Sequence, residues 1–215
     1  MILNISPRTV LEGLTLLGLD PIKIMFPILK NSGVIIYPTE TVYGLGGKAT
    51  SNQVIERIYR IKGRDKSKPL IILVRDFVMA RGLAKIEPFE GLLKGYWPGA
   101  LTGIFVAKNN LPSGIVSGEG KIAVRISSHP FVKSLFKMIN FPLISTSANR
   151  SGEPNCLTIE AAKKSLGEKF SLVDYSVDFG ELPDVPPSTL VDFTVHPAKI
   201  LRQGSVVFEP LETSG

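Results

Sequence analysis

Two polar clusters, far apart along the chain, each follow directly after a short apolar run of the β type. The first spans residues 37–46, YPTETVYGLG, and continues at residues 61–70, IKGRDKSKPL. The second spans residues 142–152, PLISTSANRSG. Ligand crevices of α/β sheets lie just beyond strand ends, so we expect both clusters at one crevice. Cations from one cluster and hydroxyls and an amide from the other suit an anionic, hydroxyl-bearing ligand such as a nucleotide.

The composition of the chain favours one large globular domain. Its 215 residues are 44% hydrophobic, which is enough to bury a sizeable core. The single cysteine, Cys156, excludes an internal disulfide framework and fits a reducing compartment, so we expect a cytoplasmic protein. Residues 1–31 carry no signal-peptide pattern and no apolar span of about 20 residues, so we expect no membrane association. The formal net charge of +6 favours anionic partners without choosing among them.

Helical and β-type segments alternate along the chain, which predicts an α/β sheet that is packed by helices and is not purely parallel. Helices are expected over residues 21–30, capped by Asp20, over 52–62, capped by Ser51, and over 76–84, 89–96, 130–139 and 159–166. Strands are expected over residues 34–37, 71–74, 101–107, 122–126, 143–145, 172–173, 190–191 and 200–201. The second helix delivers Lys62 and Arg64 at its C-terminal end.

Several familiar chemistries do not fit these residues. Residues 42–50 lack the spacing of a Walker phosphate loop, and the first strand-to-helix turn lacks the glycine pattern of dinucleotide binding. The serines of residues 145–147 do not lie in a nucleophile elbow, and two histidines, His129 and His196, argue against a zinc site or a Ser-His-Asp triad. Chemistry in this chain must therefore rest on electrostatics and positioning.

Seven short motifs occur in a fixed order between residues 22 and 204. They are PTETVYGLG (38–46), KGR with KPL (62–70), WPGALT (97–102), VRI (124–126), SAN with SG (147–152), STLVD (188–192) and ILRQG (200–204). In this order they resemble the YrdC/TsaC family of threonylcarbamoyl-AMP synthases. The resemblance implies a twisted, mixed, open β-sheet flanked by helices, with a concave basic crevice.

The resemblance also implies an activity. Such a synthase makes threonylcarbamoyl-AMP and pyrophosphate from L-threonine, bicarbonate or CO2, and ATP, with Mg²⁺ bound through the nucleotide and no separate metal site. The product serves threonylcarbamoyladenosine modification of tRNA, so tRNA and a threonylcarbamoyl-transferase complex are implied partners. Residues 1–20 are expected to be an N-terminal extension, residues 21–206 the catalytic domain of a single-domain form, and residues 207–215 a tail.

Site residues follow from the resemblance together with side-chain chemistry. Lys62 and Arg64 are the implied catalytic cations, and they are expected to face solvent and clamp the triphosphate. The other residues implied for ATP are Lys68, Ser147, Asn149, Asn155 and Arg202. Arg125 is expected to hold the threonine carboxylate, because a planar guanidinium pairs bidentately with a carboxylate. The residues expected to read the threonine hydroxyl and amine are Thr39, Thr41, Ser145 and Ser188.

Three positions depart from the family pattern. Asp65 lies beside the cations and either weakens the phosphate site or faces solvent, Leu73 replaces a histidine that helps some relatives to hold threonine, and Lys121 replaces a hydroxyl residue. Two other classes of protein stay open: an RNA-binding maturation factor with a basic face, and an inactive paralogue of the same fold. Thr39 and Thr41 could also be simple turn residues, and Arg125 a surface ion pair. Residues 177–187 are a candidate lid or hinge loop.

Overall fold

The computed structural model describes residues 2–3, 20–108 and 111–209, and their strands form two mixed sheets flanked by helices. Sheet A has the order β1 (Ile2–Leu3), β9 (Tyr175–Val177), β2 (Ile35–Pro38), β3 (Tyr43–Gly46) and β8 (Thr146–Ser147). Sheet B has the order β11 (Lys199–Arg202), β10 (Thr189–Asp192), β5 (Leu101–Val106), β6 (Lys121–Arg125), β4 (Ile72–Leu73) and β7 (Leu143–Ile144). The predicted α/β class with mixed strands is confirmed, although the strands divide between two sheets.

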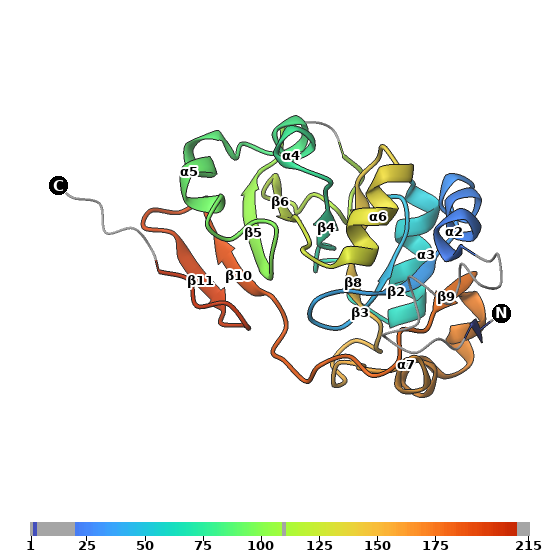
Figure 1. The fold of residues 1–215 in the computed structure, drawn as a ribbon. Helices are drawn as coiled ribbons and strands as arrows, with labels where there is room; N and C mark the ends of the chain where they lie inside the picture. Colours follow the sequence, from blue (N-terminus) through green and yellow to red (C-terminus); the bar gives the residue numbers. More distant parts are fainter. Residues whose placement is uncertain (1, 4–19, 109–110, 210–215) are drawn as a thin grey trace.

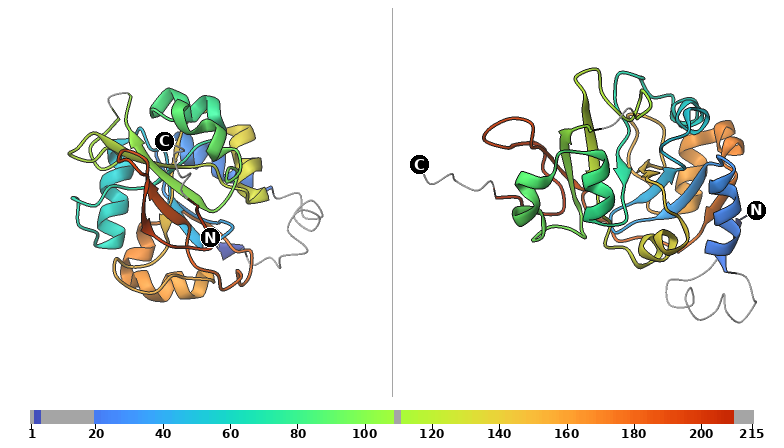
Figure 2. Two further views of the ribbon diagram at one scale, coloured as in Figure 1. Left: turned by 90° about the vertical axis from the view of Figure 1, so that its left-hand side faces the viewer. Right: turned by 90° about the horizontal axis from the view of Figure 1, so that it is seen from above.

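The helices cover both sheets. They are α2 (Pro21–Lys30), α3 (Asn52–Lys62), α4 (Phe77–Leu83), α5 (Glu90–Leu93), α6 (Pro130–Met138) and α7 (Ile159–Leu166), with 3-10 turns η1 (Glu87–Phe89) and η2 (Gly167–Leu172). Figure 1 shows α4 and α5 beside sheet B, at the left, and α2, α3 and α7 around sheet A, at the right. The left view in Figure 2 looks onto the end of the molecule formed by β5, β10 and β11.

Local capping signals set the helix starts as predicted. The Asp20 side chain accepts a hydrogen bond from the Ile22 N–H at 2.9 Å, and the Ser51 side chain accepts one from the Val54 N–H at 3.4 Å. Helix α3 ends at Gly63, whose φ of 57° lies in the left-handed region that favours glycine. This stop directs the chain after Lys62 back toward the sheets.

Other expectations were wrong. Residues 172–173 do not form a strand, because Leu172 ends η2 and the strand begins only at Tyr175. The helix expected over residues 89–96 is α5, which ends at Leu93. Strands β3 and β8 were not predicted, since the glycines of β3 and the polar pair of β8 carry little β-propensity. The N-terminal segment also contributes β1, which pairs in parallel with β9.

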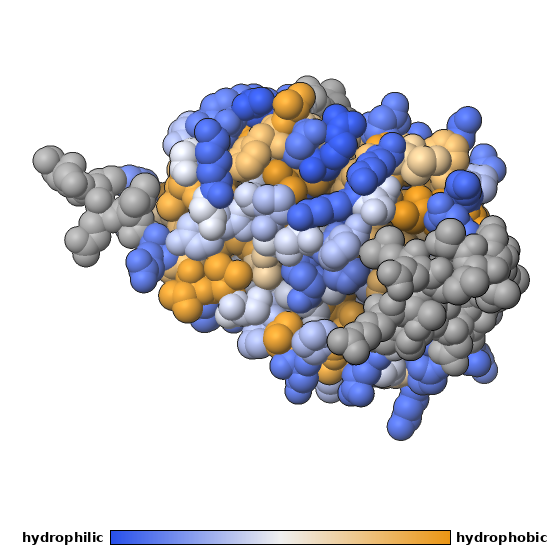
Figure 3. Space-filling view, in the orientation of Figure 1, coloured by the Kyte–Doolittle hydropathy of each residue, from blue (hydrophilic) through white to orange (hydrophobic). Residues whose placement is uncertain are grey.

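Two hydrophobic clusters form the core. The larger one joins α3, α7 and both sheets, and the smaller one joins α2 and α6 to β2 and β9. No helix in the described part of the chain has the length and apolar composition of a membrane span. The face drawn in Figure 3 mixes hydrophilic and apolar residues, with an apolar area over the β10–β11 end, where Val195, Leu201 and Val207 are exposed.

The two sheets meet where the chain passes from β7 to β8. Ser145 lies between these strands, so the chain leaves sheet B and enters sheet A within one residue. The Ile144 N–H donates to the Gly47 carbonyl oxygen at 2.8 Å, and the Ser145 N–H donates to the Ile71 carbonyl oxygen at 2.9 Å. A Cβ atom on Gly46 would lie 1.8 Å from the Ile144 carbonyl oxygen. Only glycine therefore permits this approach of β3 to the crossing segment.

Replacing Gly46 by alanine should destabilise the protein by separating the sheets. We expect Gly46→Ala to lower the free energy of unfolding by about 3 kcal/mol, the upper end of common overpacking costs, because the new methyl group meets backbone that cannot rotate away. Urea unfolding of the purified variant measures this change.

Gly91→Ala is the matched control, because a Cβ atom there meets nothing within 4 Å. This change should be neutral or raise the free energy of unfolding by up to about 1 kcal/mol, since alanine is the better helix former. Equal stability of Gly46→Ala and wild type would contradict the close approach of the sheets.

Candidate functional site

A pocket of about 760 Å³ opens where the two sheets meet, within the range of roughly 300–1,000 Å³ that is common for small-molecule sites. Its walls come from the β2–β3 turn, the loop after α3, strands β5 and β6, residues 145–147, and strands β10 and β11. The charged residues that line it are Arg64, Lys68, Lys121, Arg125 and Arg202, with Glu119 and Asp192. Because cations outnumber anions, the pocket favours an anionic ligand.

Arg64 and Lys68 lie together on one side of the pocket. The Arg64 Nε donates to the Lys68 carbonyl oxygen at 3.1 Å and Nη2 donates to that of Pro69 at 3.2 Å, which fixes the guanidinium against its own loop. Asp65 accepts a hydrogen bond from the Ser67 N–H at 2.9 Å, and this bond lowers the pKa of the exposed Asp65 carboxyl. Asp65 is exposed and shapes the turn that presents Lys68, which agrees with the solvent-facing alternative.

Lys62 is not among the residues that line the pocket, and its side chain is buried, with 2% of the residue exposed. Our expectation that this cation faces solvent is wrong. Its Nζ donates to the Ser147 carbonyl oxygen at 2.5 Å, to that of Asn149 at 2.7 Å and to Asn149 Oδ1 at 3.2 Å. Burial, assisted by the nearby Arg64 charge, lowers the pKa of Lys62 to about 7. In this structure Lys62 supports the pocket wall from behind.

The Asn149 side chain is also hydrogen-bonded behind the pocket wall. Its Oδ1 accepts a hydrogen bond from Ser147 Oγ at 2.5 Å, and its Nδ2 donates to the Glu153 carbonyl oxygen at 2.5 Å. Asn149 is buried and does not line the pocket, whereas Ser147 and Asn155 do. Lys62 and Asn149, both predicted to contact ATP, thus form a hydrogen-bonded layer beneath the pocket surface, while Ser147 lies at that surface.

Thr39 and Thr41 lie in the turn between β2 and β3, and both line the pocket. Thr39 Oγ1 donates to the Val42 carbonyl oxygen at 2.7 Å and accepts from the N–H groups of Thr41 and Val42 at 3.3 and 3.2 Å. Thr39 therefore has the hydrogen bonds of a turn residue and also lies in the pocket wall, so its contact with a ligand stays a prediction. Ser145, at the crossing of the sheets, lines the same pocket.

Arg125 ends β6 and lines the pocket, although only 6% of the residue is exposed. Its Nη2 lies 2.7 Å from Glu40 Oε1, so Arg125 does form an ion pair, but the pair is buried and the alternative of a surface ion pair is wrong. The Nε atom of Arg125 is buried and has no hydrogen-bond partner among the described residues, whereas Nη2 contacts Glu40. An arginine with a buried, unpaired Nε in a pocket wall is suited to a planar oxyanion.

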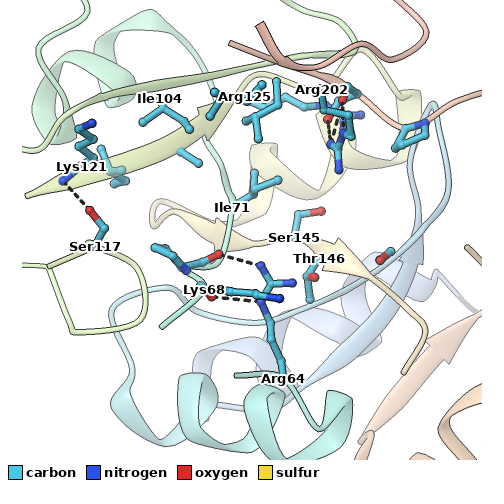
Figure 4. Close-up of a pocket in the computed structure, with 18 of the residues that line it drawn as sticks. Arg64, Lys68, Ile71, Ile104, Ser117, Lys121, Arg125, Ser145, Thr146 and Arg202 are labelled. Carbon is cyan, nitrogen blue, oxygen red and sulfur yellow. Dashed lines mark hydrogen bonds between the residues drawn. The ribbon is translucent and has the colours of Figure 1, made fainter. Parts of the chain in front are cut away.

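Arg202 lies beside Arg125, on the opposite side of the pocket from Arg64, with Ser145 between (Figure 4). Its Nη2 and Nε donate to the Ser188 carbonyl oxygen at 2.8 and 3.2 Å. Burial, with a smaller effect from the Arg125 charge, lowers the pKa of Arg202. Arg202 and Ser188 thus lie with the arginine predicted for threonine, although Arg202 was predicted for ATP.

The two remaining departures have structural explanations. Leu73 is fully buried in the smaller hydrophobic cluster and does not line the pocket. Lys121 lines the far end of the pocket, where its Nζ lies 2.8 Å from Glu119 Oε2 and 3.5 Å from Asp192 Oδ2. Its charge is therefore largely offset by neighbouring carboxylates.

The loop after β9 is attached to β3. Tyr43 Oη donates to the Gly180 carbonyl oxygen at 2.8 Å and accepts from the Phe179 N–H at 2.8 Å. Pro187, at the end of the loop, lines the pocket. These contacts connect the candidate lid to the hairpin that carries Thr39, and its movement stays a prediction.

The pocket and its motifs can be compared with known proteins. A family model named Sua5/YciO/YrdC, with the description "Telomere recombination", matches residues 27–204. This chain belongs to that family. The threonylcarbamoyl-AMP synthase of Pyrococcus abyssi is 33% identical over 193 residues, which cover 89% of this chain and 56% of that protein. The threonylcarbamoyl-AMP synthase of Bacillus subtilis is 31% identical over 188 residues, covering 86% and 54%. The chain spans just over half the length of these relatives.

Solved structures of family members share the fold. A crystal structure of P. abyssi Sua5 complexed with L-threonine matches with a TM-score of 0.82 and 31% identity, covering 95% of this chain and 57% of that one. The crystal structure of E. coli YciO matches with a TM-score of 0.75 and 26% identity, covering 86% and 89%. The two mixed sheets are therefore the fold of this family.

Burial of Lys62 should make stability depend on pH. Its folded pKa of about 7 lies below the ordinary 10.5, so between these values the unfolded chain binds more protons and stability rises with pH. Below pH 7 both states are protonated and the dependence ends. We expect the unfolding free energy of wild type, minus that of Lys62→Met, to rise above neutral pH with a slope approaching about 1.4 kcal/mol per pH unit.

Urea unfolding of both proteins at several pH values between 7 and 10 measures this difference. Lys163→Met, which removes the same charge from an exposed position on α7, is the control. Parallel pH profiles for wild type and Lys62→Met would mean that the carbonyl oxygens keep Lys62 charged throughout.

Proposed function

We propose that this chain is an ATP-dependent synthase, a nucleotidyltransferase that makes threonylcarbamoyl-AMP and pyrophosphate from L-threonine, bicarbonate or CO2, and ATP. The observation that carries the proposal is one pocket in which Arg125, with an unpaired Nε, lies opposite Arg64 and Lys68. Arg125 is suited to a carboxylate, and Arg64 with Lys68 is suited to phosphates. The names of the synthases from P. abyssi and B. subtilis, and the threonine complex of P. abyssi Sua5, support the same activity.

The proposed chemistry places two reacting groups in this pocket. The amine of threonine bonds to the carbon of CO2 and loses a proton, or bonds to the carbon of bicarbonate with loss of water. An oxygen of the resulting carbamate then attacks the α-phosphorus of ATP as the bond from that phosphorus to pyrophosphate breaks. Charge builds on the leaving pyrophosphate, so Arg64 and Lys68 would contribute most in the transition state. Ser147 and Asn155 are the nearby polar residues of the wall that we assign to the nucleotide. Thr39, Thr41, Ser145 and Ser188 are assigned to threonine.

Lys62 and Asn149 have a different part in this proposal. Because both are buried behind the wall, they hold the Ser147 segment in position, and their effect on ATP passes through that segment. Arg202 would add positive charge near the threonine carboxylate. Mg²⁺ would enter with the nucleotide, and within the described ranges no cluster of three or more His, Cys, Asp or Glu residues could hold a metal ion.

Further parts of the proposal concern the wider setting. We assign catalysis to residues 21–206 and expect the product to serve tRNA threonylcarbamoyladenosine modification in the cytoplasm. Transfer to tRNA would then require a threonylcarbamoyl-transferase complex as a partner.

The direct test is release of pyrophosphate from ATP by the purified chain. We expect release only when L-threonine and bicarbonate are both present. Release without threonine would contradict the proposal, and salt-sensitive RNA binding without turnover would favour the RNA-binding alternative.

Substitutions on the two sides of the pocket should affect the binding of different substrates. We expect Arg125→Ala to raise the KM for threonine by about tenfold to a hundredfold, as for lost hydrogen bonds to charged groups. Arg64→Ala should raise the KM for ATP and also lower kcat by about tenfold to a hundredfold, because Arg64 contributes most in the transition state. The other substrate's KM should change little in each case. Steady-state kinetics with one substrate varied at a time measures both constants.

Arg81→Ala is the control, since Arg81 pairs with Glu90 on α5 and does not line the pocket. Equal increases for both substrates in both pocket variants would mean that the assignment of the two sides is wrong.

A further inference from the structure

Glu40 is a buried acid that the predicted site did not include. It lies in the turn between β2 and β3 of sheet A, yet its side-chain partners among the described residues are Arg125, at the end of β6 in sheet B, and Ser127 and Ser128, which follow β6. Its Oε2 accepts from Ser127 Oγ at 2.5 Å, its Oε1 accepts from the Ser128 N–H at 3.2 Å, and Oε1 lies 2.7 Å from Arg125 Nη2. Only 16% of the side chain is exposed. The carboxylate is therefore fixed by three contacts from one short segment.

Glu40 and Arg125 differ in their relation to the pocket. Arg125 lines it, whereas Glu40 is not among the lining residues and so lies behind the guanidinium. Burial by itself would raise the pKa of Glu40, but the Arg125 charge and the Ser127 hydroxyl outweigh burial and lower that pKa. The carboxylate is thus ionised at neutral pH, next to the arginine that faces the ligand.

The contact leaves the guanidinium available for a ligand. A carboxylate usually pairs with an arginine through directed N–H bonds, and Glu90 accepts two such bonds from Arg81 Nη1 on the protein surface. Glu40 contacts Arg125 at Nη2, so the buried Nε stays without a hydrogen-bond partner in the described part of the chain.

We propose that Glu40 is the positioning residue that aims the Arg125 guanidinium at the carboxylate of the amino-acid substrate. The proposal rests on the proposed function for the identity of that substrate. Glu40 itself touches no substrate. Glu40 comes from sheet A and contacts Arg125 of sheet B. The guanidinium that would bind the carboxylate is thus held in place by both sheets that form the pocket.

A positioning role and a purely electrostatic role of Glu40 predict opposite changes in threonine binding when Glu40 is replaced by glutamine. If Glu40 only supplied negative charge, Glu40→Gln would make the pocket more positive, and threonine would bind more tightly. If Glu40 aims Arg125, the same variant lets the guanidinium turn, and threonine binds more weakly. Glutamine has nearly the same size and can still accept from Ser127, so the substitution tests charge pairing with little change in packing.

The experiment compares wild type, Glu40→Gln, Glu40→Asp and the control Glu90→Gln, which breaks the surface pair with Arg81. We expect Glu40→Gln to raise the KM for threonine about tenfold, as for a lost contact of a charged group, with the KM for ATP and kcat within about twofold of wild type. Glu40→Asp keeps the charge and should give an intermediate KM. Glu90→Gln should match wild type.

A lower KM for threonine in Glu40→Gln, or a loss of kcat with both KM values unchanged, would overturn the proposal. The first result would show a pure charge effect, and the second a smaller folded fraction.

A second readout does not depend on the activity. The Nε–H proton of Arg125 can be assigned in isotope-labelled protein by its absence in Arg125→Lys. Because Nε is buried, this proton should exchange slowly with solvent in wild type, and it should exchange faster in Glu40→Gln, where the guanidinium can turn. If wild type shows no threonine-dependent turnover, the proposed function is wrong. The exchange rate of the Arg125 Nε–H proton then decides by itself whether Glu40 positions Arg125. Unchanged protection in Glu40→Gln would overturn the positioning role.

Discussion

The close approach of β3 to the chain between β7 and β8 is the constraint on which the rest of the structure depends. Gly46 leaves no room for a side chain against the Ile144 carbonyl oxygen, and the Ile144 N–H bonds the Gly47 carbonyl oxygen. This contact joins sheet A to sheet B and places Ser145 at the crossing. Because the polar motifs follow strands of both sheets, the same contact gathers them around one pocket.

The charged groups of the site form two layers. Arg64, Lys68, Arg125 and Arg202 line the pocket, while Lys62 and Glu40 lie behind it. Each buried ion contacts a segment from elsewhere in the chain: Lys62 bonds the 147–149 segment and Glu40 contacts the end of β6. The buried Glu40 carboxylate is paired with Arg125, and breaking such a pair is strongly destabilising. Lys62 is instead held by carbonyl oxygens, and its pKa of about 7 lets it lose its charge near neutral pH. The second layer therefore keeps the wall of the pocket rigid and its donors preorganised.

Local signals in the sequence were sufficient to predict where helices begin, but they were not sufficient to predict strand β3. The starts of α2 and α3 follow from Asp20 and Ser51, because a cap acts within three residues of itself. Strand β3 was missed because it is held by pairing on both sides, which overrides the low β-propensity of its glycines.

The sequence motifs contain most of the residues that line the pocket, but they did not show which charged residues are buried behind its wall. Lys62 was expected at the surface, since the three oxygens that bury it lie in residues distant in sequence. Glu40 stood inside a quoted motif without a role, because its partners Arg125 and Ser127 become neighbours only when the sheets meet. An acid flanked by two threonines at a strand end was the one available signal.

The central claim is that one pocket at the junction of the sheets holds both substrates, with the carboxylate and the phosphates on opposite sides. A crystal structure of the chain with L-threonine and a non-hydrolysable ATP analogue tests it most directly. The account predicts the threonine carboxylate on Arg125 Nε and Nη2, and the phosphates on Arg64 and Lys68. Phosphates on Arg125, or threonine bound outside this pocket, would contradict it.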